Sequence, residues 1–256
     1  MKNEIQIMIN QFVKNYSNTR DVQTKWKEPL VAYADATDKM FYNLKNVVSP
    51  SHALPVDFLP DAKTVVAYFI PFDESIVNSN IPGKESSKIW ATAYVETNQL
   101  ILDINIFIKS ELEKSGYTST LIPPTHNFDS EKLIADWSQR HVAFIAGLGT
   151  FGLNNMLITD KGCCGRVGSF VTDLEIAPTE RKSGENCLYK HMNTCKKCVD
   201  RCENSALTVD RYDRHKCYEM CLYNVEIHSD IGFSDVCGKC LVGIPCSTVN
   251  PVKNQL

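Results

Sequence analysis

The chain has 256 residues, of which 43% are hydrophobic and 22% charged, and its formal net charge is −3. This composition is typical of a soluble globular protein with one large or two smaller domains, and it excludes extended disorder. The charge gives no basic footprint for nucleic acid, and the longest apolar run, residues 100–108, is too short to cross a bilayer. Because no apolar core of signal-peptide length follows the first residue, we expect a cytoplasmic protein in a reducing compartment.

The first hundred residues predict two helices and one buried strand. Residues 4–16 carry apolar side chains at spacings of three and four, which predicts an amphipathic helix. The prolines between residues 17 and 60 indicate loops and helical fragments. Residues 63–70 form a β-branched and aromatic run that predicts a strand buried on both faces. Residues 86–116 predict a long helix that ends at a glycine, on which Tyr94 and Asn98 are expected to serve packing and solvation.

The next segment contains a glycine-rich motif. Residues 117–122 predict a strand, and Asp129 or Ser130 is expected to cap a following helix. Gly147-Leu-Gly149-Thr-Phe-Gly152 spells the dinucleotide-binding fingerprint, with an aspartate about twenty residues later. That site also needs a preceding strand, for which residues 142–146 are the candidate, and a long following helix, which further glycines interrupt. We therefore favour a loop that lets the backbone approach a flat cofactor, or that turns a corner.

Residues 156–160 and 169–173 predict two strands around a loop that contains Cys163, Cys164 and Arg166. Buried, inert thiols are the favoured interpretation of the cysteine pair, and contact with a cofactor or redox partner is the alternative. Arg166 is a candidate for contact with the anionic edge of a cofactor. The polar segment 177–184 predicts a linker between a domain of residues 1–180 and a domain of residues 181–256.

Nine of the eleven cysteines lie between Cys187 and Cys246. The run Cys195-Lys-Lys-Cys198-Val-Asp-Arg-Cys202 has the spacing in which one loop wraps an iron–sulfur cube while its last thiolate reaches another cluster. Two four-iron clusters need eight ligands, and the pattern contains eight: Cys187, Cys195, Cys198, Cys202, Cys217, Cys237, Cys240 and Cys246. Cys221, four residues after Cys217, is the nearest substitute.

Two other uses of these cysteines compete with iron–sulfur ligation. A disulfide framework needs an oxidising compartment and is disfavoured by the odd cysteine count. A single zinc ion held by the two Cys-x2-Cys pairs, 195/198 and 237/240, is the stronger alternative. The zinc scheme leaves four cysteines without a role, so the sequence favours clusters.

Together with residues 146–155, the cysteine pattern resembles the epoxyqueuosine reductase family, which is related to the cobalamin-dependent reductive dehalogenases. The resemblance implies an α/β (α+β) N-terminal domain of corrinoid-reductase type and a C-terminal ferredoxin-like domain with two [4Fe-4S] clusters. It also implies cobalamin beside Gly147, Gly149, Gly152 and Arg166. It further implies crossover ligation, with one cluster on Cys187, Cys195, Cys198 and Cys246 and the other on Cys202, Cys217, Cys237 and Cys240.

Two functional hypotheses follow from this resemblance. In the first, the chain is an iron–sulfur oxidoreductase whose clusters deliver electrons to a corrinoid or a small-molecule substrate in the α/β domain. The family's catalytic aspartate has no counterpart here, because the matching position falls between Asp129 and Asp136. Epoxyqueuosine in tRNA is therefore not the expected substrate. In the second hypothesis, the chain is a non-catalytic electron carrier or reductive activator of a redox partner protein.

Overall fold

The computed structural model describes residues 2–253, and a three-stranded antiparallel sheet lies at its centre. The strand order is β1 (Leu30–Asp35), β2 (Thr64–Pro71), β7 (Gly165–Thr172), so β2 is the middle strand. All eight residues of β2 are buried, which confirms the predicted strand and its coverage on both faces. The sequence did not predict β1. Its alanines have little β propensity, so this strand is stabilised mainly by its pairing with β2.

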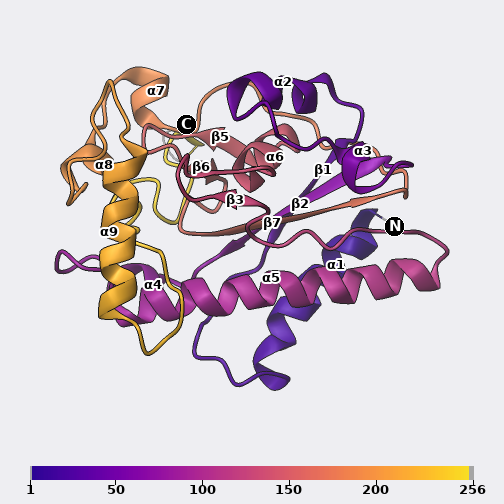
Figure 1. The fold of residues 1–256 in the computed structure, drawn as a ribbon, viewed down its shortest axis with the longest axis horizontal. Helices are drawn as coiled ribbons and strands as arrows, with labels where there is room; N and C mark the ends of the chain where they lie inside the picture. The colour runs from indigo at the N-terminus through magenta and orange to yellow at the C-terminus, as the bar shows by residue number, and fades with distance from the viewer. Residues whose placement is uncertain (1, 254–256) are drawn as a thin grey trace.

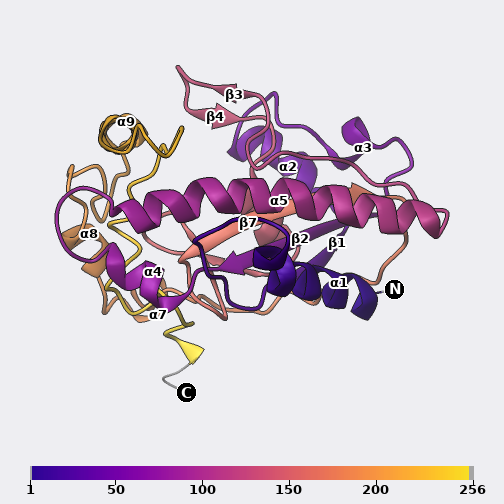
Figure 2. The same ribbon diagram turned by 90° about the horizontal axis from the view of Figure 1, so that it is seen from below.

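Helices cover both faces of the sheet (Figures 1 and 2). One face packs against α1 (Lys2–Asn15) and α5 (Lys88–Lys114), which confirms both predicted helices. The other face packs against α2 (Lys39–Val47) and α6 (Gln139–Ile145). Alternate residues of β2 enter the two cores: Val66, Tyr68 and Ile70 on the α1/α5 side, and Val65, Ala67 and Phe69 on the other. A slip of one residue would exchange these two sets, so the packing fixes the register.

The long helix α5 connects the sheet to the cysteine-rich part of the chain (Figure 1). It begins after Ser87, whose hydroxyl accepts a hydrogen bond from the backbone N–H of Trp90 at 3.1 Å. It ends just before Gly116, which has a φ of +81°, as the predicted glycine stop requires. No helix within residues 2–253 is long and apolar enough to span a membrane.

The segment between α5 and α6 differs from the prediction. Residues 117–122 form no strand, and only an isolated bridge joins Ser119 to Thr172. The short hairpin β3 (Phe128–Asp129) and β4 (Ile134–Ala135) then stands where a helix was expected. The carboxylate of Asp129 accepts hydrogen bonds from two backbone N–H groups of the hairpin turn, at 3.0 and 2.9 Å. Asp129 therefore stabilises a turn and does not cap a helix.

The glycine-rich motif joins a helix to a hairpin. Residues 142–146 belong to α6 and its end and do not form a strand. The motif continues into the antiparallel pair β5 (Gly149–Phe151) and β6 (Leu157–Thr159), and no helix follows. A strand, turn and helix in succession are what a dinucleotide site requires. The motif therefore turns a corner here, which is one of the two roles favoured from sequence.

The cysteine-rich part is mostly turns and is hydrogen-bonded to the segment that leads into α5. The backbone N–H of Ser86 donates to Asn224 Oδ1 at 2.9 Å, and Lys239 Nζ donates to the carbonyls of Asn80 and Pro82, both at 2.8 Å. The remaining short elements are η1 (Tyr16–Asn18), α3 (Pro55–Phe58), α4 (Glu74–Ser79), α7 (Leu188–Met192), α8 (Lys197–Asp200) and α9 (Arg214–Ile227).

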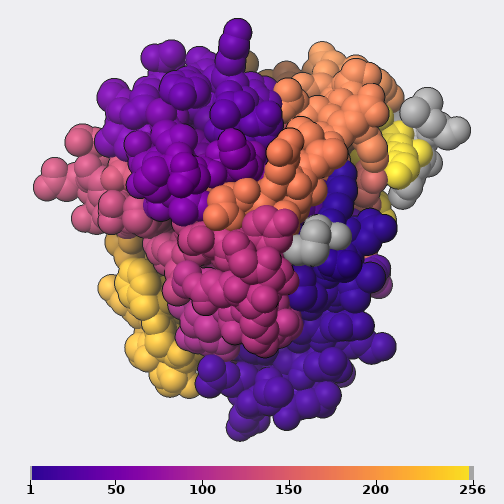
Figure 3. Space-filling model, turned by 90° about the vertical axis from the view of Figure 1, so that its right-hand side faces the viewer, coloured from indigo at the N-terminus to yellow at the C-terminus, as the bar shows by residue number. Residues whose placement is uncertain are grey.

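The segment predicted as a linker is exposed and follows the surface of the sheet domain. The backbone N–H of Thr179 donates to the carbonyl of Tyr33 in β1 at 2.8 Å, and Arg181 forms an ion pair with Asp38 at 2.6 Å. Figure 3 shows this part of the chain, in orange, crossing the face between the N-terminal elements. The division into domains at residue 180 stays a prediction.

Candidate functional site

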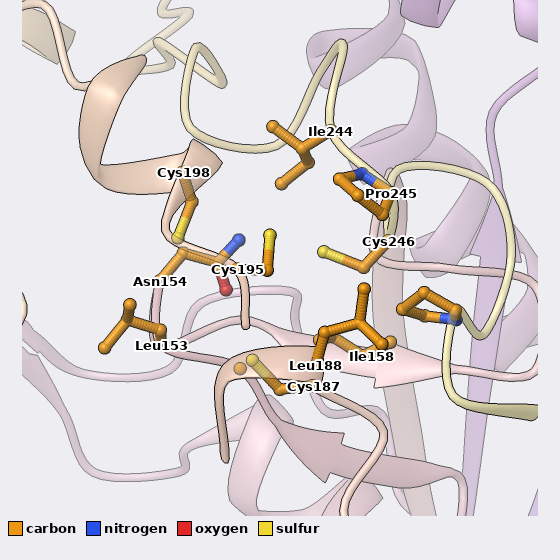
Figure 4. Close-up of a pocket in the computed structure, with 12 residues that line it drawn as sticks. Leu153, Asn154, Ile158, Cys187, Leu188, Cys195, Cys198, Ile244, Pro245 and Cys246 are labelled. Carbon is orange, nitrogen blue, oxygen red and sulfur yellow. The ribbon is translucent and has the colours of Figure 1, made fainter. Parts of the chain in front are cut away.

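The first predicted set of cysteines lines one pocket. Cys187 precedes α7, Cys195 and Cys198 flank the start of α8, and Cys246 lies in the C-terminal loop. Figure 4 shows these four side chains around the same space. The apolar side chains beside them include Leu153, Ile158, Leu188 and Ile244. Four thiols from three segments in an apolar pocket are the donor set that an iron–sulfur cube uses, so the residues present fit such a cluster.

Burial makes the thiol of Cys198 hard to ionise without a bound cation. Burial, together with the neighbouring thiols of Cys246, Cys187 and Cys195, raises the pKa of Cys198 to about 12. Several thiolates crowded into one apolar space repel each other, and a metal centre removes that cost because its positive charge deprotonates coordinating thiols. Filling of this pocket by metal should therefore stabilise the fold of the C-terminal loops.

The second predicted set of cysteines lines a larger cavity of about 230 Å³. Cys202 follows α8, Cys217 lies in the first turns of α9, and Cys237 and Cys240 lie in the C-terminal loop. Residues 195–202 thus contribute thiols to both spaces, as crossover ligation would require. This set also fits a four-iron cluster by its donor chemistry.

Cys221 is a fifth thiol at the second cavity, one helical turn after Cys217. A hydrogen bond from Cys221 lowers the pKa of Cys217, and Tyr212 and Arg140 lower it further. The hydrogen bond to Cys217 raises the pKa of Cys221. Since thiolates are the form that binds metal, Cys217 is the better ligand candidate of the two.

The geometry does not match the zinc or disulfide alternatives. The two Cys-x2-Cys pairs lie at different spaces, with 195/198 at the first pocket and 237/240 at the second cavity. Within residues 2–253, no group of three or more His, Cys, Asp or Glu side chains is arranged to hold a single metal ion. All eleven cysteines are free thiols. A single zinc closed by both pairs therefore requires a different chain path.

Of the three candidate glycines, only Gly152 borders one of these spaces. A Cβ there would lie 2.7 Å from Asn154 Oδ1 and 2.9 Å from Ile158 Cδ1, so these two side chains would have to shift to admit any other residue. Gly149 lies against the backbone of Ile158 in the β5/β6 pair, where a Cβ would overlap the carbonyl. Gly147 has a φ of +88° and turns the chain beside Arg181. Gly147 and Gly149 thus shape the chain and line neither space.

Arg166, the fourth cofactor candidate, lies in the wall of the second cavity. Its guanidinium carbon lies 4.3 Å from the centre of the Tyr94 ring, and Nη2 donates to Asn98 Oδ1 at 2.7 Å. The Tyr94 hydroxyl donates to Asp235 Oδ1 at 2.6 Å. Burial raises the pKa of both Tyr94 and Asp235. Tyr94 therefore lies in the cavity wall, beyond the packing role expected from sequence.

Sequence reasoning missed Asp235, Arg140 and Tyr212, which also line this cavity. No motif marks them, because they come from separate segments that only the fold brings together.

Cys163 and Cys164 are both buried, as the inert interpretation expects. The backbone N–H of Cys163 donates to the carbonyl of Cys246 at 2.9 Å, so this pair holds the C-terminal loop beside the first pocket.

No protein-family model and no curated protein sequence matches the chain. Solved structures of epoxyqueuosine reductase do match its fold. A selenomethionine-labelled epoxyqueuosine reductase matches with a TM-score of 0.58 at 16% identity, over 94% of this chain and 66% of that one. The enzyme from Streptococcus thermophilus matches with a TM-score of 0.53 at 15% identity, over 92% and 65%.

A third structure, epoxyqueuosine reductase with an epoxyqueuosine-modified tRNA-Tyr stem loop, matches with a TM-score of 0.56 at 15% identity, over 94% of this chain and 66% of that one. This chain thus spans just under two thirds of the length of the proteins that it matches. At such identities the likeness concerns the fold. It confirms the resemblance predicted from the cysteine spacing and residues 146–155: the chain has the mixed α/β fold of epoxyqueuosine reductase.

Proposed function

We propose that this protein is an iron–sulfur oxidoreductase in which two [4Fe-4S] clusters deliver electrons to a small-molecule substrate in the second cavity. One observation carries the proposal: the eight predicted cysteines divide, four and four, between two neighbouring spaces in the crossover order. The fold shared with a reductase supports the same reaction class. The clusters, when bound, would supply single electrons.

The chain's own residues supply orientation and protons at the second cavity. Tyr94 and Asp235 share a hydrogen bond in the cavity wall, so a proton is held at Tyr94 Oη where reduction of a substrate would consume it. The sequence offered only Asp129 and Asp136 for this role. Asp129 lies in the β3/β4 turn, and Asp136 accepts a hydrogen bond from Ser51 Oγ at 2.6 Å, so neither lines the cavity.

Cobalamin does not fit the second cavity. Pockets for drug-sized ligands measure about 300–1,000 Å³, and cobalamin is larger than such ligands. The cavity of about 230 Å³ is smaller than that range and must also take the cluster on its cysteines. Trp90 and Tyr94 form part of the wall that limits this volume. We therefore propose direct reduction of a small substrate and no step through a corrinoid.

Electrons must reach the first cluster from a separate redox protein, which is the partner that we propose. Nucleic acid is not a proposed partner, because the net charge of −3 gives no general attraction to a phosphate backbone. A cytoplasmic location, where a reducing environment preserves thiolate ligands, also stays part of the proposal.

Filling the second cavity tests the proposal. Ala206 is 2% exposed and lines the cavity, so Ala206→Phe places a ring where substrate would bind. Ala177→Phe, at an exposed position, is the matched control. Iron content should be the same in both variants. We then expect Ala206→Phe to slow reoxidation of the dithionite-reduced protein by small quinone and nitroaromatic acceptors, while reoxidation by an oxidised ferredoxin is unchanged. Equal rates for both variants with every small acceptor would favour the electron-carrier function instead.

A further inference from the structure

Two arginine side chains line the second cavity, and neither has a carboxylate partner. Among residues 2–253, neither Arg140 nor Arg166 forms an ion pair within 4 Å. A guanidinium group in a partly apolar cavity is stabilised when it pairs with an anion. The two arginines lie in different surroundings, so we expect a different negative group to balance the charge of each.

Arg140 faces the cluster cysteines. Its Nη1 donates to the carbonyl of Asn155 at 2.8 Å and contacts Met156 Sδ at 3.3 Å. Its charge acts on the thiols of Cys217 and Cys240. A bound cluster with four thiolates is negatively charged, so it supplies the counter-charge of Arg140. The metal centre would therefore balance the positive charge of Arg140.

Arg166 is held in the cavity wall by the central sheet. It belongs to β7, where it pairs with Ile70 of the central strand, so its backbone is fixed by the sheet. The Tyr94 ring and Asn98 orient the guanidinium from the side. Its Nε–H is buried inside the wall and has no hydrogen-bond partner among the described residues. The nearby carboxylate of Asp235 interacts with the charge of Arg166, but its hydrogen bond comes from Tyr94. An arginine that is oriented in this way, lines a cavity and forms no ion pair within 4 Å in residues 2–253 can hold a small anion.

We propose that Arg166 anchors the carboxylate of a small organic acid, which is the substrate of the second cavity. The apolar part of the acid would pack on Phe72 and Trp90, whose rings meet edge to face at 5.2 Å in the same wall. This assignment rests on the proposed function, because it places the acid in the cavity where the second cluster delivers electrons. The cavity volume of about 230 Å³ limits the acid to a compact molecule.

The test uses the full chain, loaded with iron under anaerobic conditions, and three probes: benzoate, its neutral isostere benzamide, and inorganic phosphate. Calorimetry measures affinity, and the paramagnetic spectrum of the reduced protein reports whether the probe lies near a cluster. We expect benzoate to bind more tightly than benzamide or phosphate. Arg166→Gln should weaken benzoate about 10- to 100-fold, the loss typical of one charge-assisted hydrogen-bonded pair, and Arg166→Lys should weaken it less.

Arg211→Gln is the matched control, because Arg211 is an exposed arginine that does not line the cavity. It should leave benzoate affinity within about twofold. Equal benzoate affinity in wild type and Arg166→Gln, equal binding of benzamide, or equal losses in both arginine variants would overturn the assignment. Tighter binding of phosphate would also overturn it. Failure of the proposed function is distinguishable, since it would appear as protein without iron, whose benzoate binding can still be measured.

Discussion

Substitution of Gly238 tests how the cysteine-rich part packs against α5. This glycine lies between Cys237 and Cys240 and has a φ of +73°. A Cβ there would lie 2.5 Å from Cε2 and Cζ2 of Trp90, a side chain that is 2% exposed and packed against Phe72. Gly238→Ala therefore adds a backbone cost and an overlap with a ring that has no room to move.

The expected magnitude is the sum of these two costs. A residue with a Cβ in the left-handed region costs about 1–2 kcal/mol, and overpacking a well-packed core costs about 1–3 kcal/mol. Gly243→Ala is the matched control in the same loop, because its φ is +68° but the nearest atoms to its Cβ lie at 3.6 Å. We thus expect Gly238→Ala to be less stable than Gly243→Ala by about 1–3 kcal/mol.

Urea unfolding of iron-loaded protein under anaerobic conditions measures this difference. Gly238→Ala should also lose the second cluster before the first, because the glycine separates two of the second cluster's proposed ligands. Iron content and the paramagnetic spectrum would report that order. Equal stability of the two variants, or equal loss of both clusters, would refute the seating of this loop against Trp90.

Three further predictions concern the clusters, the corrinoid and pH. Cys198→Ser and Cys202→Ser should each abolish a different cluster signal, because their thiols line different spaces, and loss of one and the same signal in both would contradict crossover. Cob(II)alamin added in excess to the reduced protein should keep its free paramagnetic spectrum, since the cavity is too small for it, whereas a changed spectrum would contradict that limit. Burial, with Arg140 and His52, lowers the pKa of His141 to about 4 from its ordinary 6.5. The neutral ring therefore contributes stability that is present above pH 6.5 and lost as the pH falls towards 4. The loss should be about 1–2 kcal/mol in the free energy of unfolding, after allowance for partial exposure of the ring. His141→Gln should flatten the dependence of the free energy of unfolding on pH in this range.

The sequence predicted the elements whose signal is local and strong. The buried run of β2 and the one-faced pattern of α5, with its terminal glycine, are specified by their own residues. The division of the cysteines into two sets of four was implied by the family resemblance and not by the spacing alone. The two sets line different spaces, and their binding of clusters stays a prediction.

The elements that the sequence missed depend on distant partners. β1 forms because it pairs with β2. Asp129 stabilises a hairpin turn, whereas its local sequence alone favours the cap of a helix. The cavity wall is the hardest case. Tyr94, Arg166 and Asp235 come from α5, β7 and the C-terminal loop, and nothing in their local sequence indicates that they meet.

Metal analysis tests the central claim most directly. The chain should be reconstituted with iron and sulfide under anaerobic conditions, and its iron, sulfide and zinc contents measured together with its optical spectrum. Two four-iron clusters predict about eight iron atoms per chain and a broad absorbance near 400 nm. About one zinc per chain without that absorbance would contradict the account.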